Sequence, residues 1–282
     1  MVIPCTDTVI VDVPVLALAE LDVQGTLRFS DTLDIALAAD WIRVSGRFEI
    51  GRTAQPFQHH ATLTLTDQYA FGCNPAAVQR ALVVDQSGVI SFHGASHGPT
   101  WTRLAQTANA GAQQLETEDI VAWQAGDEIV IAPTEFDTEE SEVAVVLSVG
   151  GTTVRLNAPL QFTHWGATEG AQFDGVGVEE RAEVGLFTHN IVVQGDPAAF
   201  DPSTGKHTGG QTRLHEPGAS APRACIDGVE FRYLGDEEVL GRYPLHFHML
   251  DDGSQSYVRN SSVHECFNRW ISVHMTDGVT LE

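Results

Sequence analysis

The chain has 282 residues, and its apolar fraction of 43% and charged fraction of 19% are typical of an ordered soluble protein and exclude a disordered one. Its formal net charge is −23, and all of its 15 basic residues except Lys206 are arginines. Such a surface disfavours nucleic acid and anionic membranes as partners, because both require basic patches. An anionic polysaccharide would also be repelled at long range, so it would need a local cationic pocket or a bridging cation.

The ends of the chain carry no recognisable targeting signal. No apolar run is long enough to span a bilayer, so we expect no membrane insertion in this segment. The first residues, MVIPCTDTVIVDV, lack the basic start and continuous apolar stretch of a signal peptide. Because the chain stops at GVTLE inside a predicted strand, we expect a fragment of a longer protein, whose missing ends could include a secretion signal. The cysteines match no zinc module and their pairing stays open: Cys5, Cys73, Cys225 and Cys266.

The first half of the chain predicts consecutive strands. Apolar and polar residues alternate over 21–29, 42–50 and 61–65, which is the pattern of a sheet packed on one face. Further strands are predicted at 81–85, 89–93, 128–132, 143–149 and 153–156. Long amphipathic helical stretches are scarce, so we predict an all-β protein.

Beyond Val184 the predicted strands become shorter and the turns between them vary in length. The strands are predicted at 190–194, 226–233, 244–249, 257–264, 270–274 and 279–281. Residues 196–223 are rich in Gly, Pro, Ser and Thr and are predicted to form a long loop, which in a compact domain is often functional.

Three segments share one sequence pattern: IDGVEF, VRNSSVH and TDGVTL. Aligning Gly228, Asn260 and Gly278 shows that the copies recur at unequal offsets along the chain. Irregular recurrence of this kind predicts a solenoid with loop insertions, whose coils stack at about 4.8 Å. A sandwich with repeated turns is the alternative.

The most informative stretches are RYPLHFHML (242–250) and NRWISVHMT (268–276). They align when His248 meets His274, an offset of about one coil of a parallel β-helix. Side chains of a strand alternate between its two faces, so the apolar residues should point into the coil. The outward set would then bring together imidazoles, an indole and a guanidinium: Arg242, His246, His248, Trp270, Ser272 and His274.

This outward face predicts a site rather than packing alone. On a strand His246 and His248 would lie roughly 6.6 Å apart, with His274 one coil away at about 4.8 Å. Three imidazoles at that spacing could hold a divalent transition metal ion, with Asp251 or Asp252 as carboxylate ligands. They could equally act as a general base and a charge neutraliser on a uronic acid sugar. A histidine ladder that serves only packing is the third interpretation.

Two further side chains are candidates for substrate binding. Trp270 could stack on the apolar face of a sugar ring, unless a loop such as 196–223 covers it. Arg242 shares the parity of the histidines and could bind a uronate carboxylate. It belongs to a local group of arginines that could instead form ion pairs with neighbouring acids: Arg223, Arg232, Arg242, Arg259 and Arg269.

Several segments of the sequence resemble a known protein family. VIPCTDTVIVD, LDVQGTLRF and ADWIRVSGRFEIG look like the G-eight domain, an all-β extracellular module. VEFRYLG, GRYPLHFHML and YVRNSSVHECFNRWISVH resemble the right-handed parallel β-helix of the same proteins. These are the family of the cell-migration-inducing hyaluronan-binding protein, with its transmembrane paralogue, fibrocystin-type proteins and bacterial secreted homologues. Two features depart from the pattern of the family. The loop 196–223 matches no expected intervening strand, and the chain ends where the family's β-helix would continue.

The resemblance implies a fold, a location and a partner. We expect a G-eight-like β domain over 1–166 and a right-handed parallel β-helix over 167–282, in an extracellular or cell-surface protein. The family implies binding of hyaluronan or a related polysaccharide and, in some members, its depolymerisation. A divalent metal ion is the only cofactor expected. The alternative is a non-catalytic adhesion or scaffold module, and a metal-storing or redox site is a third.

The positions of the carboxylates bear on which type of depolymerisation this chain could catalyse. Hydrolysis usually needs two carboxyl groups at a fixed separation, and Asp251 and Asp252 would diverge on a strand. A lyase instead needs a base and a neutraliser of the uronate, which histidine with arginine or a metal could supply. The sequence thus leaves a hyaluronidase-like and a lyase-like enzyme open, with His246, His248 and His274 as the candidate catalytic and metal-binding residues.

Overall fold

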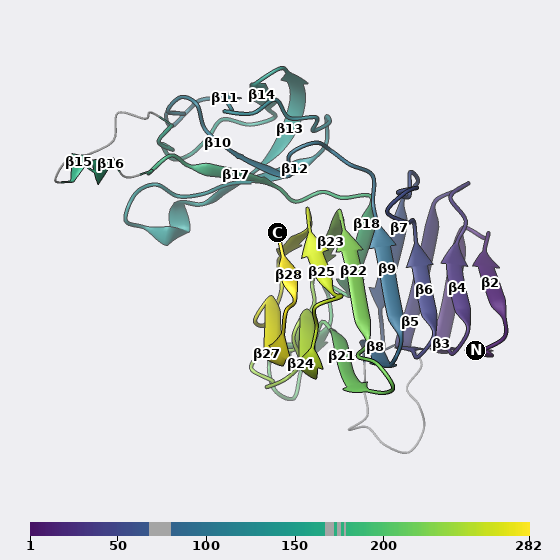
Figure 1. Cartoon of the computed structure of the whole chain (residues 1–282). Coiled ribbons are helices and arrows are strands. Elements are labelled where there is room, and N and C mark those ends of the chain that lie inside the picture. Colours follow the sequence, from purple (N-terminus) through teal and green to yellow (C-terminus); the bar gives the residue numbers. More distant parts are fainter. Residues whose placement is uncertain (68–79, 167–171, 174–175, 178) are drawn as a thin grey trace. The chain divides into compact units, whose positions relative to one another are not determined.

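The computed structural model describes residues 1–67, 80–166, 172–173, 176–177 and 179–282. Among these residues there is no α-helix, and strands dominate, so the all-β prediction is confirmed. The chain divides into two compact units, one of residues 1–95 with 189–282 and one of residues 96–188 (Figure 1).

The first unit is a parallel β-helix, as predicted. Its strands pair in parallel with the equivalent strands of the coils before and after. The first side consists of β1 (Val2–Ile3), β3 (Val15–Val23), β5 (Ile35–Val44), β7 (Ala61–Leu65), β18 (Ile191–Gly195), β23 (Val229–Arg232) and β26 (Ser262–His264). The second consists of β8 (Ala81–Gln86), β21 (Gln211–Pro217), β24 (Leu245–Asp252) and β27 (Ile271–Asp277). The third consists of β2 (Thr8–Val11), β4 (Thr26–Phe29), β6 (Arg47–Ile50), β9 (Val89–His93), β22 (Arg223–Asp227), β25 (Tyr257–Arg259) and β28 (Thr280–Leu281).

The long strand β5 is where one side of the β-helix becomes two. Its first half, from Ile35 to Ala39, pairs with β7, and its second half, from Trp41 to Val44, pairs with β8. The first and second sides therefore form one continuous sheet at β5 and are separate strands in every later coil. The connections 233–244 and 265–270 between these two sides contain no strand.

Apolar side chains of one strand parity fill the interior of the coils. Phe29, Phe48 and Phe92 come from successive coils of the third side and stack with ring centroids 5.5 and 5.2 Å apart. The alternation in the sequence therefore reflects an inside and an outside of a solenoid, rather than one packed face of an open sheet.

The corner between the third and first sides corrects two predicted strands. Gly228 and Asn260 have φ values of +67° and +49°, a left-handed conformation that turns the chain. The stretch 226–233 is therefore split into β22 and β23, and 257–264 into β25 and β26. Gly228 and Asn260 are equivalent corners, since Asp227 pairs with Arg259 and Glu230 with Ser262.

The third member of the predicted repeat is not equivalent to the other two. Val258 pairs with Leu281, so Gly278 belongs to the corner before the third side. The shorter offset, from Asn260 to Gly278, joins two different corners of the coil, which explains why the two offsets differ.

The domain boundary differs from the predicted division at residues 166 and 167. Strands of residues 1–95 and of residues 189–282 pair directly, for example Ile191 with Ala61 and Arg223 with Val89. The G-eight-like segment is therefore the first part of the same β-helix. The change to shorter strands and variable turns near Val184 occurs where the chain returns to the β-helix after an inserted unit.

The loop predicted at 196–223 contains a strand of the β-helix. Its residues Gln211–Pro217 form β21, which lies between β8 and β24. The short hairpin of β19 (Phe200–Asp201) and β20 (Lys206–His207) precedes it.

The second unit is an antiparallel β structure with its own core. It consists of β10 (Trp101–Arg103), β11 (Gln114–Glu116), β12 (Glu128–Ile131), β13 (Glu142–Gly150), β14 (Thr153–Leu156), β15 (Gln172–Phe173), β16 (Val176–Gly177), β17 (Glu183–Leu186) and the 3-10 turn η2 (Thr138–Glu140). Leu104, Trp123 and Ile129 belong to its buried cluster. The buried His164 ring contacts the Glu142 carboxylate at 3.1 Å.

Two predictions about the whole chain can be compared with the described residues. No helix among them is both long and apolar enough to cross a membrane. Cys5, Cys225 and Cys266 are free thiols, and Cys73 lies outside the described residues.

Candidate functional site

The candidate site lies on the outer face of the second side, where β24 and β27 are neighbours. His248 pairs in register with His274, and His246 with Ser272. Leu245 and Phe247 alternate with these residues and are fully buried inside the coil. The structure thus places the histidines outward and side by side, as the alignment of His248 with His274 predicts.

His246 is the buried member of the group. Although it points outward, only 3% of its surface is exposed, because the loop 233–244 covers it and the Tyr243 ring lies 4.9 Å away. Its Nδ1 lies 3.1 Å from the Gly241 carbonyl oxygen. A carbonyl only accepts, so Nδ1 carries the proton and Nε2 presents a lone pair.

The Nε2 atom of His246 is buried and has no hydrogen-bond partner among the described residues. Burial is the main cause that lowers the pKa of His246 to about 4, so the ring is neutral at pH 7. A buried nitrogen without a partner costs free energy. A neutral imidazole with a free, preoriented lone pair is also the form that binds a metal ion.

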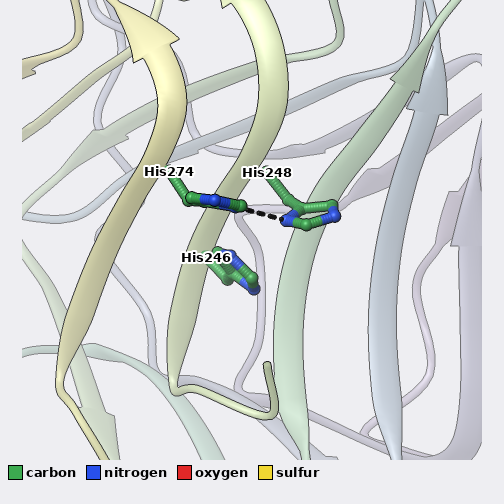
Figure 2. Close-up of side chains that lie close together, drawn as sticks. All are labelled: His246, His248 and His274. Atoms are coloured by element: carbon green, nitrogen blue, oxygen red, sulfur yellow. Dashed lines mark hydrogen bonds between the residues drawn. The ribbon is translucent and has the colours of Figure 1, made fainter. Parts of the chain in front are cut away.

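His248 and His274 complete the group. Their Nδ1 atoms lie 3.2 Å apart, so in the neutral state one donates and the other accepts. Burial, followed by the neighbouring His274, lowers the pKa of His248. One ring nitrogen from each of His246, His248 and His274 can be chosen so that all three lie within 4.8 Å of one another, and Figure 2 shows the three rings together.

A short loop anchored by Asp236 positions His246. The Asp236 carboxylate accepts hydrogen bonds from Arg242 at 2.9 Å and from the Gly210 backbone N–H at 3.2 Å. Asn268 donates to the Asp236 carbonyl at 2.7 Å. The loop that carries Gly241 and Tyr243 is therefore held at its base, and Arg242, predicted to contact ligand, is engaged with Asp236.

The other predicted binding residues have different surroundings. Trp270 directly precedes β27 and is 56% exposed, so no loop covers it. Asp251 and Asp252 follow a bulge after His248, and neither belongs to the group of three histidines. The Asp252 carboxylate accepts a hydrogen bond from the Ser254 N–H instead.

The bulge separates the histidines from these aspartates for a local reason. Met249 and Met275 follow His248 and His274 and have φ values of +53° and +46°. A left-handed residue breaks the alternation of a strand, so the aspartates do not continue the face that carries the imidazoles.

Several of the predicted local arginines are in ion pairs. Arg232 contacts Glu230 at 3.1 Å and Arg259 contacts Asp227 at 2.9 Å. Arg269 instead lies over the Tyr243 ring, 5.8 Å from its centroid. The alternative interpretation as ion pairs therefore describes Arg232, Arg242 and Arg259.

Sequence reasoning missed two polar residues beside the histidines. Arg213 of β21 pairs in register with His246, and the Nε2 atom of His215 lies 3.5 Å from the Arg213 guanidinium. The alternation of Gln211, Arg213 and His215 with apolar Leu214 was a usable signal, but the surrounding Gly, Pro and Ser residues favoured a loop.

The fold and the site define the class of protein: a parallel β-helix with a histidine group on an outer face and an inserted antiparallel β unit. Residues 1–105 match the G8 domain and residues 207–282 match the CEMIP β-helix. The chain therefore belongs to the family of proteins that combine a G8 domain with this β-helix.

Known relatives match most or all of the chain but are much longer. Human fibrocystin-L is 34% identical over 100% of this chain, which spans 8% of that protein. A G8 domain-containing protein of Dictyostelium discoideum is 30% identical over 85% of this chain, with 20% of its own length covered. Among solved structures, the tailspike of Pseudomonas phage phi297 aligns with a TM-score of 0.31 and 13% identity, over 87% of this chain and 39% of the tailspike.

Proposed function

We propose that this chain is the glycan-binding part of an extracellular or cell-surface protein, and that the outer face with His246, His248, His274 and Trp270 binds the saccharide. The main observation is that three imidazoles offer ring nitrogens within 4.8 Å of one another, and that the Nε2 of His246 is buried and has no hydrogen-bond partner among the described residues. Packing alone would favour a hydrogen-bonded or apolar side chain at that position. The exposed indole of Trp270 offers a platform for the apolar face of a sugar ring.

We propose that the histidine group holds a divalent transition metal ion. The neutral His246 and the free lone pair fixed by Gly241 support this assignment, because imidazole nitrogen suits zinc, copper and nickel. Asp251 and Asp252 are left out of the ligand set. A bound cation would neutralise the carboxylate of a uronic acid sugar, and it would give a local attraction on a chain whose net charge of −23 otherwise repels such a ligand.

The favoured ligand is a uronic acid polysaccharide of the hyaluronan type. The family resemblance supports this choice. Turnover of the same ligand by the histidine group without a metal ion is a second candidate, favoured by a half-buried His248 whose lowered pKa leaves it neutral and able to accept a proton. The described surroundings offer imidazoles rather than a carboxyl pair, which favours an elimination. Products without the absorbance of an unsaturated uronate would contradict that step.

The metal assignment predicts a stoichiometric metal content. Protein incubated with Zn²⁺ and dialysed should retain about one equivalent by elemental analysis, and a His248→Ala/His274→Ala variant should retain none. His59→Ala/His60→Ala is the matched control, because it removes two histidines outside the group. Equal zinc in wild type and the first variant, or none in either, would contradict the assignment.

The glycan assignment predicts a specific effect of Trp270. Trp270→Ala should weaken binding of hyaluronan oligosaccharides about tenfold, because stacking on an indole contributes on the order of 1 kcal/mol or more. Trp101 is a matched control, since it is 53% exposed and lies in the inserted unit. Calorimetric titration measures the affinity of a Trp270→Ala and a Trp101→Ala variant for the oligosaccharides. Unchanged affinity in Trp270→Ala would favour a scaffold module.

A further inference from the structure

Three arginines converge on one buried carboxylate on the third side of the β-helix, away from the histidine group. Glu49 of β6 is only 3% exposed and accepts hydrogen bonds from Arg28 at 2.7 Å, Arg47 at 2.5 Å and Arg52 at 2.9 Å. The side chains of Arg28, Arg47 and Arg52 stay partly exposed, at 35%, 44% and 47%. Sequence analysis did not single out this group.

A cavity opens beside two of these arginines. It has a volume of about 630 Å³ and is lined by Arg28 and Arg52 but not by Arg47. That volume is within the range of small-molecule sites, which is roughly 300–1,000 Å³. Ile10 and Pro56 form its apolar part, and Ser30, Asp31, Gln55 and Gln58 supply polar groups.

The walls of the cavity are fixed by backbone hydrogen bonds. Arg52 and Gln55 exchange two of them, each 2.9 Å long, and the Asp31 carboxylate accepts the N–H groups of Gln58 at 2.9 Å and His59 at 3.2 Å. At Gly51, φ is +69° and a Cβ would lie under 3.0 Å from the backbone of His93 and Phe57. The loop therefore presents Arg52 in a preformed turn, which lowers the entropy cost of binding.

Two arginines, Arg28 and Arg52, line the cavity on an otherwise acidic chain. Glu49 and Asp31 offset their formal charges, so recognition depends on the hydrogen-bond donors that the two guanidinium groups leave unused. Each guanidinium has five N–H donors, and Glu49 occupies only part of them. Among the described residues, Glu49 is the one hydrogen-bond acceptor that the side chains of Arg28 and Arg52 contact. The free donors of these two arginines can form the paired hydrogen bonds that a carboxylate accepts.

We propose that this cavity is a second saccharide site, which binds the carboxylate of a uronic acid sugar through Arg28 and Arg52. The unused N–H donors of these two guanidinium groups match the two oxygens of one carboxylate. The amides of Gln55 and Gln58 and the hydroxyl of Ser30 match sugar hydroxyls, and the exposed Ile10 side chain matches the C–H face of the ring. The site shares its ligand class with the proposed function but does not depend on the histidine group.

The test is an NMR titration of the isotopically labelled chain with glucuronate and with methyl glucoside, a sugar without the carboxylate. Glucuronate should shift signals of the cavity residues at millimolar concentration, and methyl glucoside should bind at least about tenfold more weakly, the effect of losing one charge-assisted hydrogen bond. Arg52→Gln should weaken glucuronate binding by a similar factor. Arg47→Gln is the matched control, because it loses an equivalent bond to Glu49 but lies outside the cavity.

The outcomes separate this site from the histidine face. The His248→Ala/His274→Ala variant should retain the cavity shifts with glucuronate. No shifts at about 10 mM ligand, equal binding of the two sugars, or equal losses in Arg52→Gln and Arg47→Gln would overturn the proposal. Loss of the cavity shifts in the histidine variant alone would assign the ligand to the other face and overturn it as well.

Discussion

At the residue scale, a backbone carbonyl determines the chemistry of His246. The Gly241 carbonyl accepts a hydrogen bond from Nδ1–H, and burial keeps the ring neutral, so the lone pair of the ring is on Nε2. The sequence predicted that His246, His248 and His274 share a face, because their parity and the coil-length offset of His274 from His248 require it. It could not predict that His246 is buried, since the covering loop has no periodic pattern.

Glu49 is the residue for which a pH dependence can be predicted. Burial raises the pKa of its carboxyl, but the hydrogen bonds from Arg47, Arg28 and Arg52 outweigh that effect and bring it down to about 2. A carboxyl whose folded pKa lies below its unfolded value stabilises the fold above the unfolded pKa, about 4.3. That stabilisation is lost as the pH falls from there to about 2.

The variant Glu49→Gln isolates this contribution. At pH 7 its free energy of unfolding should be lower than that of wild type, by about 2 kcal/mol after allowance for the solvent-exposed arginines. The difference should shrink as the pH falls toward 2, because wild type then loses the same charge. Urea unfolding of both proteins across pH 2.5–7 measures it, and a difference independent of pH would contradict the explanation.

At the element scale, glycines let successive coils approach each other at one corner. Gly25, Gly46 and Gly88 precede the third-side residues Thr26, Arg47 and Val89, which pair in register. A Cβ on any of them would lie under 3.0 Å from a backbone carbonyl oxygen. This corner needs glycine for space, not for a left-handed φ, since the values of these three are ordinary.

Gly46→Ala should therefore destabilise the β-helix by about 3 kcal/mol, the upper part of the range for overpacking. Gly150→Ala is the matched control, because its Cβ would meet nothing within 4 Å and its φ is unstrained. Denaturant unfolding, with circular dichroism to confirm the β content, measures both changes. Equal stability of the two variants would show that the corner can relax around a methyl group.

The strand β21 shows where element prediction failed. Its residues alternate as a strand should, but they lie between turn-rich segments, and composition favoured a loop. Pairing of Arg213 with both Val83 and His246 is what fixes the strand. Val83 lies far upstream of Arg213 in the chain and His246 lies in the following coil, so no local signal contains these partners.

At the scale of the whole molecule, the β-helix is interrupted by a unit with a separate core. Residues 96–188 bury their own apolar cluster, and the β-helix buries another. The two ends of the interruption are adjacent, since the Ala95 N–H donates to the Asn190 side chain at 2.8 Å. Asn190 also donates to the carbonyls of Phe57 and His59, at 2.7 and 2.8 Å, which fixes the point of return.

Replacing residues 96–188 by a short Gly-Ser linker should consequently leave the β-helix folded, because insertions between close chain ends are tolerated. The shortened chain should unfold cooperatively and, by the metal analysis above, should still retain zinc. Asn190→Ala in the full chain should lower stability, by roughly 2 kcal/mol for the lost buried hydrogen bonds. A shortened chain that is soluble but lacks cooperative unfolding would show that the β-helix needs the insertion.

The sequence by itself determined the all-β class, the stacking of coils and the outward histidines, because strand alternation and a coil-length offset are local or repeat properties. Only the tertiary structure decided that residues 1–95 and 189–282 form one solenoid, that the loop 233–244 buries His246, and that Arg28, Arg47 and Arg52 meet at Glu49. Each of these depends on contacts between segments that lie far apart in the chain, and alternation within one strand carries no information about its partner.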